Sequence, residues 1–328
     1  MNLGDNIKIQ IEMHFDRKDI NMKRFLILLL MGLSLMHVYS QNMAQYNHYI
    51  ANQGILNPAY NGTRDVISGI LVHRNQWIGG DGAPMNEALN IHGPIEGTNL
   101  GVGLWVANDH LGFTNTFDCF GAASYKLRID KNQFLSLGLQ LGVSSLVYDG
   151  TKAELNQPGD QVFFGKQSRI NMNVGFGAYY FGDSYFGGFS IPKFFSNEFS
   201  FDKIEYKNIL SAKNLHTYLY GGYIFEWGDV MVKPTLLSRF VYGAPLEFDV
   251  TGNVLLMEKL WLGLSYRTTS ELVFLTEYII DRRFTVRYSF DYSLAKINSF
   301  GTWGSHEISL QFDFTFNRRP GMRSIRYF

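Results

Sequence analysis

The segment FLSLGLQLGV, residues 134–143, carries an apolar side chain at every second position. Serine, glutamine and glycine occupy the positions between the leucines, so one side is apolar and the other is small or polar. Successive side chains of a β-strand point to opposite faces, and this period of two therefore predicts a strand with one face in an apolar environment. The same alternation recurs in segments 100–106, 170–180, 260–267, 283–294 and 306–316.

Weaker alternation predicts more strands, separated by short stretches of turn-forming residues. These candidates are residues 65–75, 85–94, 114–128, 184–191, 215–227, 230–241, 245–257 and 272–281. Turns at 130–133, 180–185, 226–230 and 280–284 are short enough to join antiparallel neighbours as hairpins, whereas 149–168 and 192–214 are longer connections. The chain thus predicts about fourteen strands joined in sequence.

A soluble β-sandwich also alternates in polarity, and three features favour a transmembrane barrel instead. Many strands approach the roughly 9–11 residues that cross a bilayer when tilted. Aromatic residues cluster at strand ends, at 179–181, 223–227 and 312–316, as interfacial girdles would require. The polar faces carry side chains that a dry core would not tolerate but a wet or plugged lumen would: Gln140, Asn171, Arg267, Arg287 and Asp291.

The predicted fold is therefore an all-β, transmembrane antiparallel β-barrel of about fourteen strands in the outer membrane. The leucines of 135–141 are expected to face lipid, and the glycine pairs at 101–103 and 175–177 to face the lumen. Closing the sheet removes the free edges that hydrocarbon would leave without hydrogen-bond partners.

Composition narrows the class of partner further. The 29 basic residues balance 29 acidic ones, so nothing favours nucleic acid as a partner. A single cysteine, Cys119, excludes an intrachain disulfide and a cysteine metal cluster, and we expect it to be a packed residue. The 33 glycines and 16% aromatic content suit a β-rich chain.

The N-terminal region contains a predicted secretory signal peptide, MKRFLILLLMGLSLMHVYSQ, at residues 22–41. Lys23 and Arg24 form its basic start, residues 25–36 its apolar run, and residues 38–40 its cleavage site. The apolar run is too short for a spanning helix, which needs roughly 20 residues.

This pattern divides the chain into two parts. We assign residues 1–40 to the signal region, within which residues 1–21 precede a second methionine, Met22, and fit a misassigned start. The remainder, residues 41–328, shows no shift in composition and is predicted to be a single barrel domain.

Catalytic constellations are not found in the sequence. Ser305, His306 and Glu307 are consecutive, so a strand cannot place the serine and the histidine on the same face. Other histidines are scattered, without metal-ligand spacing or a nucleophile motif: His73, His92, His110 and His216. We therefore predict no enzymatic activity, no metal and no cofactor.

Two stretches near the expected mature N-terminus are less generic than the rest. In the first, NPAYNG at residues 57–62, Asn57 and Pro58 form a turn before the first strand. The second, RNQWIGGDGAP at residues 74–84, lies at the end of that strand. They are interpreted either as an ordinary first hairpin with a girdle tryptophan, or as a plug or docking loop. The candidate positions are Asn57, Pro58, Tyr60, Arg74, Gln76 and Trp77.

These stretches carry a family resemblance. Gln45-Tyr46 followed by NPAYNG, then RNQWIGGDGAP, and GSHEISLQFDF at 304–314 together resemble the PorP/SprF family of outer-membrane barrels of the type IX secretion system of Bacteroidota. The similarity extends from about residue 43 to 316. Small departures occur at Asn61-Gly62 and at Met85-Asn86, where the common family form has Ala-Gly and Thr. The final aromatic strand also resembles a barrel-insertion signal, although about a dozen residues follow it from Asn317.

The resemblance implies a non-enzymatic role in exporting proteins that carry type IX C-terminal signals and in holding them on the cell surface. It implies periplasmic ring-forming and peptidoglycan-binding partners and a secreted client, in some members an adhesin of gliding motility. The alternative is a porin or a channel for small or hydrophobic solutes, which an open lumen would favour and a filled one would oppose.

Overall fold

The computed structural model describes residues 45–152, 165–200, 205–209, 215–242, 244–294 and 303–314. The predicted signal region, the second start at Met22 and the residues after Phe314 lie outside these ranges. The sheet lies within the compact unit Asn42–Tyr242 with Leu246–Phe328.

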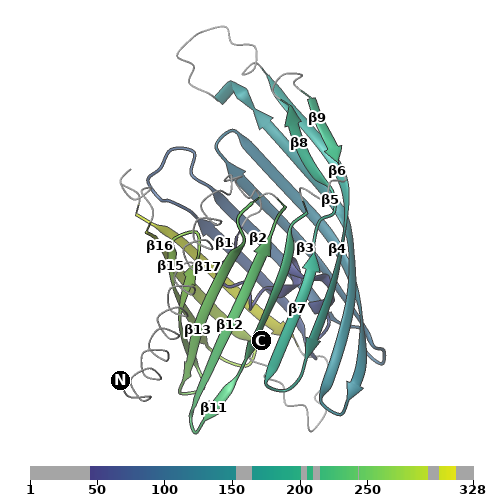
Figure 1. Ribbon diagram of the computed structural model, residues 1–328, viewed down its shortest axis with the longest axis vertical. Coiled ribbons are helices and arrows are strands. Elements are labelled where there is room, and N and C mark those ends of the chain that lie inside the picture. Colours follow the sequence, from purple (N-terminus) through teal and green to yellow (C-terminus); the bar gives the residue numbers. More distant parts are fainter. Residues whose placement is uncertain are drawn as a thin grey trace, which may run out of the picture. The chain divides into compact units, whose positions relative to one another are not determined.

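The sheet is built from antiparallel strands that follow one another along the chain (Figure 1). Its strands are β1 (Ile67–Asn75), β2 (Met85–Pro94), β3 (Leu100–Leu111), β4 (Thr114–Asp130), β5 (Gln133–Asp149), β6 (Lys166–Phe181), β7 (Tyr185–Ile191), β10 (Thr217–Tyr223), β11 (Phe225–Trp227), β12 (Val230–Phe240), β13 (Glu247–Leu256), β14 (Leu260–Arg267), β15 (Glu271–Ile279), β16 (Phe284–Ser293) and β17 (Ser305–Phe314). Each candidate strand of the sequence corresponds to one of these elements.

Two pairings close the sheet into a barrel. β1 pairs with β17, and β10 pairs with β12, so no strand of the ring is left at an edge. β11 continues β10 along the same neighbour, β12, and the two therefore count as one interrupted strand of the wall. The result is a closed fourteen-strand antiparallel barrel, which confirms the predicted fold.

A hairpin that was not predicted lies in the long connection between β7 and β10. It consists of β8 (Ser196–Ser200) and β9 (Glu205–Ile209), which pair with each other in a separate two-stranded sheet. Three short helices complete the described elements: α2 (Gln53–Leu56), η1 (Pro58–Tyr60) and η2 (Gly150–Lys152). Among the described residues, no helix is both long and apolar enough to span a bilayer.

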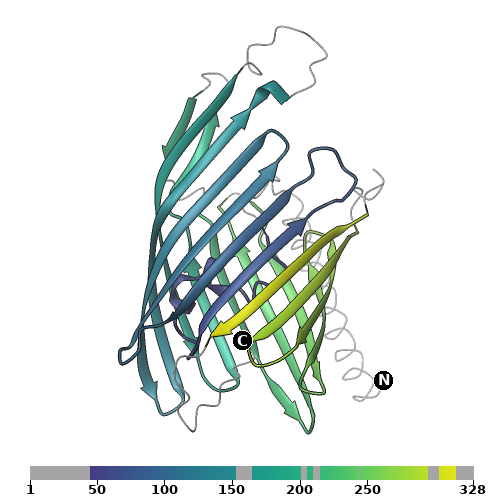
Figure 2. The same cartoon turned by 180° about the vertical axis from the view of Figure 1, so that it is seen from behind.

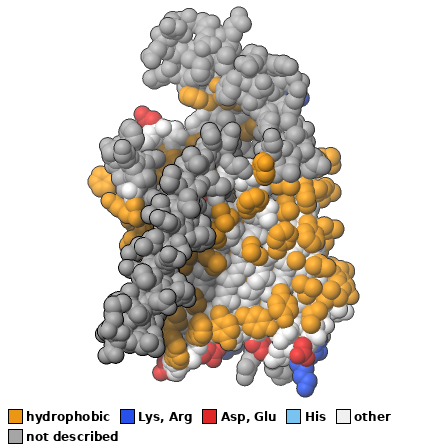
Figure 3. All heavy atoms as spheres, in the orientation of Figure 1, with side chains coloured by type: hydrophobic (Ala, Val, Ile, Leu, Met, Phe, Trp, Pro, Cys, Tyr) orange, Lys and Arg blue, Asp and Glu red, His pale blue; other side chains and the backbone are white. Residues whose placement is uncertain are grey.

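The wall has an apolar outer face and a polar inner face, as the alternation predicted. Leu139 is 65% exposed on the outside, whereas its neighbour Gln140 is 3% exposed and points inward. Figure 3 shows hydrophobic side chains spread over the part of the outer face that the grey residues leave visible. The charged residues Arg267, Arg287 and Asp291 are buried in the interior.

One detail of the prediction was wrong. Tyr179 and Phe181 were assigned to an interfacial girdle, but both point into the barrel and are buried in an aromatic cluster with Phe186 and Tyr220. Only Tyr180, which lies between them, faces outward. Strand alternation decides the outcome, since three consecutive residues cannot share one face.

The two ends of the barrel differ. At the short-turn end, Ile67 of β1 pairs with Phe314 of β17, and the connections are 95–99, 131–132, 182–184, 228–229, 257–259 and 280–283. The long-loop end carries residues 76–84, 112–113, 150–165, 192–216, 241–246, 268–270 and 294–304. Outer-membrane barrels have short periplasmic turns and longer extracellular loops, so the long-loop end corresponds to the cell surface.

Candidate functional site

The lumen is occupied by residues 45–63, which precede β1 and are called the lumen segment below. Its central residues are almost fully buried: Asn57, Ala59 and Asn61 are 0% exposed. Figure 2 shows this start of the described chain, in purple, inside the ring of strands. The segment has little regular structure, only α2 and η1, and contacts with the wall hold it in place.

The first anchor of the lumen segment is a buried carboxylate. Glu307 of β17 accepts hydrogen bonds from the backbone N–H of Asn47 at 2.8 Å and of His48 at 3.0 Å. The Nδ1 atom of His48 lies 3.0 Å from the same carboxylate, and Arg74 of β1 lies 3.5 Å from it on the wall. These contacts satisfy the buried charge, which would otherwise be costly in the interior.

Asn47 joins this anchor to two further strands. Its side-chain amide donates to Ser289 Oγ at 2.8 Å and to the carboxylate of Asp291, both on β16. Arg74 also donates to Asp291, so the guanidinium bridges the acids of β16 and β17. The segment thereby completes a polar network that begins on the wall.

The network extends around the lumen along β12, β13 and β14. Asp249 accepts from Arg239 at 2.5 Å and from Arg267 at 3.1 Å, and Arg267 donates to Glu271 at 2.5 Å. Arg267 also lies 3.4 Å from the side-chain oxygen of Asn47. Alternating charges on neighbouring strands therefore compensate one another in a site closed to solvent.

The second anchor is the turn at Asn57-Pro58. The side-chain oxygen of Asn57 accepts from the backbone N–H of Ala59 at 2.9 Å and caps η1, and Pro58 occupies the first helical position. The amide of Asn57 donates to the carbonyls of Ala178 on β6 at 3.0 Å and Phe189 on β7 at 3.3 Å. One side chain thus both forms the turn and attaches it to the wall.

Wall glycines make room for this turn. A Cβ atom added at Gly138 would overlap the backbone of Pro58 and Ala59, and one added at Gly177 would overlap Asn57. Gly101 and Gly103 face residues 61–62 in the same way. The lumen-facing glycines of the sequence therefore serve as a cradle for the segment, because no larger residue would fit.

Aromatic rings and serine hydroxyls of the wall contact the second half of the lumen segment. The ring of Tyr60 packs edge-on against Tyr179 at 5.4 Å and against His92 at 5.3 Å between centroids. Ser124 donates to the carbonyl of Asn61 at 2.5 Å, and Ser190 donates to that of Leu56 at 2.8 Å. These contacts attach residues 56–61 of the segment to β2, β4, β6 and β7.

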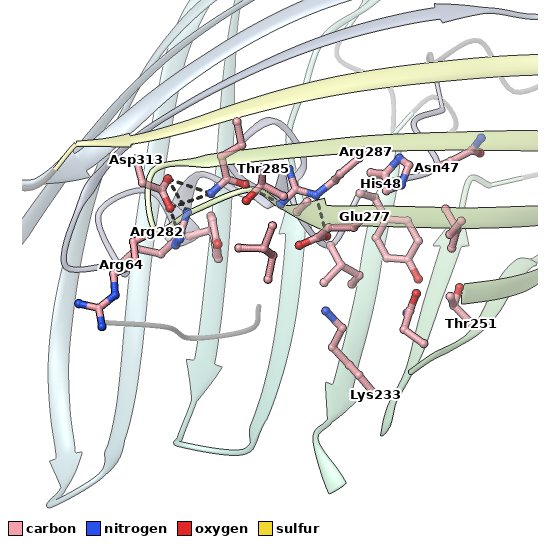
Figure 4. Close-up of a pocket in the computed structure, with 18 of the residues that line it drawn as sticks. Asn47, His48, Arg64, Lys233, Thr251, Glu277, Arg282, Thr285, Arg287 and Asp313 are labelled. Carbon is pink, nitrogen blue, oxygen red and sulfur yellow. Dashed lines mark hydrogen bonds and ion pairs between the residues drawn. The ribbon is translucent and has the colours of Figure 1, made fainter. Parts of the chain in front are cut away.

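A cavity of about 110 Å³ remains between the segment and strands β12, β13, β15, β16 and β17. Figure 4 shows Lys233 pointing toward Glu277, which accepts from Arg287 Nε at 2.7 Å. Arg64 pairs with Asp313 at 2.6 Å on the side of the short-turn end. A smaller cavity of about 50 Å³ lies between the segment and Pro192, Tyr218 and Arg239.

One acidic side chain in a turn of the short-turn end is stabilised by backbone hydrogen bonds. Asp281, in the turn between β15 and β16, accepts hydrogen bonds from the backbone N–H of Arg283 at 2.7 Å and of Phe284 at 2.8 Å. These bonds hold the pKa of Asp281 below its usual range, because they favour the charged carboxylate.

The structure divides the sequence-predicted positions into two groups. Asn57, Pro58, Tyr60 and Arg74 all lie in the lumen, within the site just described. Gln76 and Trp77 lie apart, in the connection 76–84 at the long-loop end. Gln76 donates to Asn86 at 2.9 Å, and the Trp77 backbone, with φ 47°, donates to Ser305 Oγ at 3.2 Å.

Several residues of the site were not assigned to it from the sequence, in which Glu307 was considered only as part of a catalytic triad. Asn47, His48 and Glu307 form the first anchor, and Asp249 is the central acid of the neighbouring strands. Alternation on 306–316 could have placed Glu307 on the inner face, although it could not reveal that Asn47 and His48 bind this carboxylate.

The structure separates His306 from its two neighbours. His306 points outward, with Nδ1 2.8 Å from the hydroxyl of Tyr288, whereas Ser305 and Glu307 point inward. Within the described ranges no cluster of His, Cys, Asp and Glu could hold a metal ion.

The fold and its filled lumen define an outer-membrane β-barrel whose interior is occupied by its own residues 45–63. The chain belongs to the PorP/SprF family: residues 38–312 match the family described as "Type IX secretion system membrane protein PorP/SprF". Family and fold are those of a membrane barrel of the type IX secretion system rather than of an enzyme.

Similar solved structures are other barrels. The CymD monoaromatic hydrocarbon channel has a TM-score of 0.48 and 10% identity, covering 88% of this chain and 97% of that chain. A FadL homologue of Pseudomonas aeruginosa has a TM-score of 0.43 and 9% identity, covering 80% and 94%. The KdgM porin has a TM-score of 0.35 and 11% identity, covering 75% and 99%. No curated protein matches this chain in sequence.

Proposed function

We propose that this barrel is a non-enzymatic docking component of type IX secretion, which supports the export and surface attachment of proteins with C-terminal secretion signals. Family membership supports the coarse role. The finer role, holding a secreted client at the cell surface, is our proposal, as are its periplasmic ring-forming and peptidoglycan-binding partners. A gliding-motility adhesin is one such client.

The observation that carries the proposal is the filled lumen. An open, charge-lined lumen would favour a porin or a small-solute channel, whereas here residues 45–63 fill the space that solutes would need. Their anchors are buried and paired, so the segment is a fixed part of the barrel rather than a loosely held loop. A filled barrel is better suited to binding a protein at its rim than to conducting solutes.

Co-purification tests this proposal. The protein is tagged at its C-terminus, extracted from the outer membrane in mild detergent, and its partners are identified by mass spectrometry. We expect secretion components and a large surface protein to be recovered. A solitary barrel that opens stable conductances in planar bilayers would instead identify a transport channel and exclude the docking role.

Two tryptophans at opposite ends of the barrel provide a matched comparison. Trp77 lies in the long-loop connection 76–84, and Trp227 is 69% exposed at the short-turn end. If the long-loop end docks the client, Trp77→Ala reduces the recovered surface protein severalfold, whereas Trp227→Ala leaves it unchanged. Equal recovery with both variants would argue against a docking role for Trp77.

A further inference from the structure

The lumen segment does not take the short path expected for a chain that leads into β1. The first residue of β1 and the last residue of β17 pair at the short-turn end, which is the periplasmic end of such barrels. A chain arriving directly from the periplasm could therefore enter β1 without crossing the lumen. The contacts of residues 45–63 show a different path.

Contacts along the segment follow the barrel axis in order. Arg64 pairs with Asp313 near the short-turn end, and residue 61 lies against Gly101 and Gly103 at the beginning of β3, on the same end. Further upstream, Asn52 accepts from Asn90 in the middle of β2 at 2.9 Å. Going toward the N-terminus, the chain thus runs away from the short-turn end.

The first described residues of the lumen segment lie at the long-loop end. Asn47 binds Asp291 and Glu307, which lie in the halves of β16 and β17 next to the long loops. Gln45, the first residue of the described chain, donates to Glu247 at 3.3 Å, and Glu247 begins β13 at the long-loop end. From residue 64 back to residue 45, the segment therefore crosses the lumen from one end to the other.

We infer that Gln45 lies at the cell-surface mouth of the barrel, beside the long loops, and that from there the chain runs through its own lumen to β1. The long-loop end is the extracellular end by the general architecture of outer-membrane barrels. The inference is independent of the docking role, since it rests on chain direction alone.

The same path joins distant parts of the wall. Asn47 and His48 contact β16 and β17, and Asn57 contacts β6 and β7, which lie far from β16 and β17 in the order of the ring.

Cysteine accessibility on intact cells tests the inference. Gln45→Cys is introduced in a chain whose free and half-buried Cys119 is replaced by alanine, and the cells are treated with a membrane-impermeant maleimide. Asp81→Cys, exposed in the connection 76–84, reports the long-loop end, and Lys131→Cys, exposed in the turn 131–132, reports the short-turn end. A heat-modifiable shift in gel mobility verifies that each variant is folded.

We expect Gln45→Cys to be labelled on intact cells together with Asp81→Cys, while Lys131→Cys reacts only after permeabilisation. Labelling of Gln45→Cys only after permeabilisation would overturn the inference. Labelling only after denaturation would do so too, because residue 45 would then be enclosed. A peptide epitope inserted after Asn42, detected by antibody on intact cells, gives the same readout without a substitution in the lumen.

Discussion

At the level of single residues, Glu307 connects the lumen segment to the wall. It is 0% exposed and receives two backbone N–H groups of the segment, while Arg74 lies beside it. Removing one partner of a buried charge pair typically costs about 3–5 kcal/mol, since the other charge stays buried without compensation. We expect Glu307→Ala to lower the free energy of unfolding by about that amount, measured by urea unfolding in lipid vesicles.

An exposed ion pair serves as the control for this prediction. Asp65 lies 3.8 Å from Lys126 at the surface, where such a pair contributes about 0–1 kcal/mol. Asp65→Ala should therefore leave the unfolding curve almost unchanged. If Glu307→Ala were as mild as Asp65→Ala, the segment would not depend on this carboxylate.

The glycine cradle makes a second prediction at this scale. Gly138→Ala would place a methyl group against the backbone of residues 58–59, and such overpacking costs about 1–3 kcal/mol. Gly252→Ala is the matched control, because nothing lies within 4 Å of the added Cβ atom. We expect Gly138→Ala to lower the melting temperature and to make residues 45–63 sensitive to added protease, and Gly252→Ala to do neither.

At the level of elements, the strands were predictable because their information is local. Alternation is a property of neighbouring residues, and it identified each strand of the wall and the inward direction of Gln140, Arg267 and Asp291. Composition alone misled: the aromatic residues at 179–181 suggested a girdle, whereas strand alternation directs Tyr179 and Phe181 inward.

The lumen segment could not be predicted in the same way. Residues 45–63 have no period, and their partners lie far away in sequence, as with Asn47 and Glu307 or Asn57 and Ala178. Composition had indicated small residues on the inner face without deciding between water and a plug. Only the closed barrel brings Gly138 and Gly177 opposite residues 57–59 and so decides the question.

The outer face of β5 permits a test of its contact with lipid. Leu139 lies in the middle of the apolar alternation, where an arginine facing the bilayer midplane costs about 2–4 kcal/mol. Ile129 is 58% exposed beside the turn 131–132, where the same substitution costs about 0–1 kcal/mol. We expect Leu139→Arg to reduce folding stability in vesicles by more than Ile129→Arg. Equal costs would mean that residue 139 does not face hydrocarbon.

At the level of the whole molecule, strand pairing closes the wall and the lumen segment fills the interior. The pairing of β1 with β17 and of β10 with β12 removes sheet edges from the bilayer, and residues 45–63 then fill the space that the ring encloses. The buried charges of β12–β17 would favour water and ions in an empty barrel, but here they are paired with one another and with Asn47 and His48. The same polar face that resembles a pore lining therefore acts as the binding site of the segment.

Conductance measures the effect of the lumen segment directly. We expect the complete mature protein to give little or no stable conductance in planar bilayers, because residues 45–63 are held within the ring of strands. Deleting residues 42–63 should open a charge-lined passage and produce stable conductances, provided that a heat-modifiable band shows the variant barrel to be folded. Gly252→Ala, which leaves the segment untouched, should stay closed like the parent. A parent protein that conducts as well as the deletion variant would show that residues 45–63 do not obstruct the lumen, and the barrel would then belong with the transport channels.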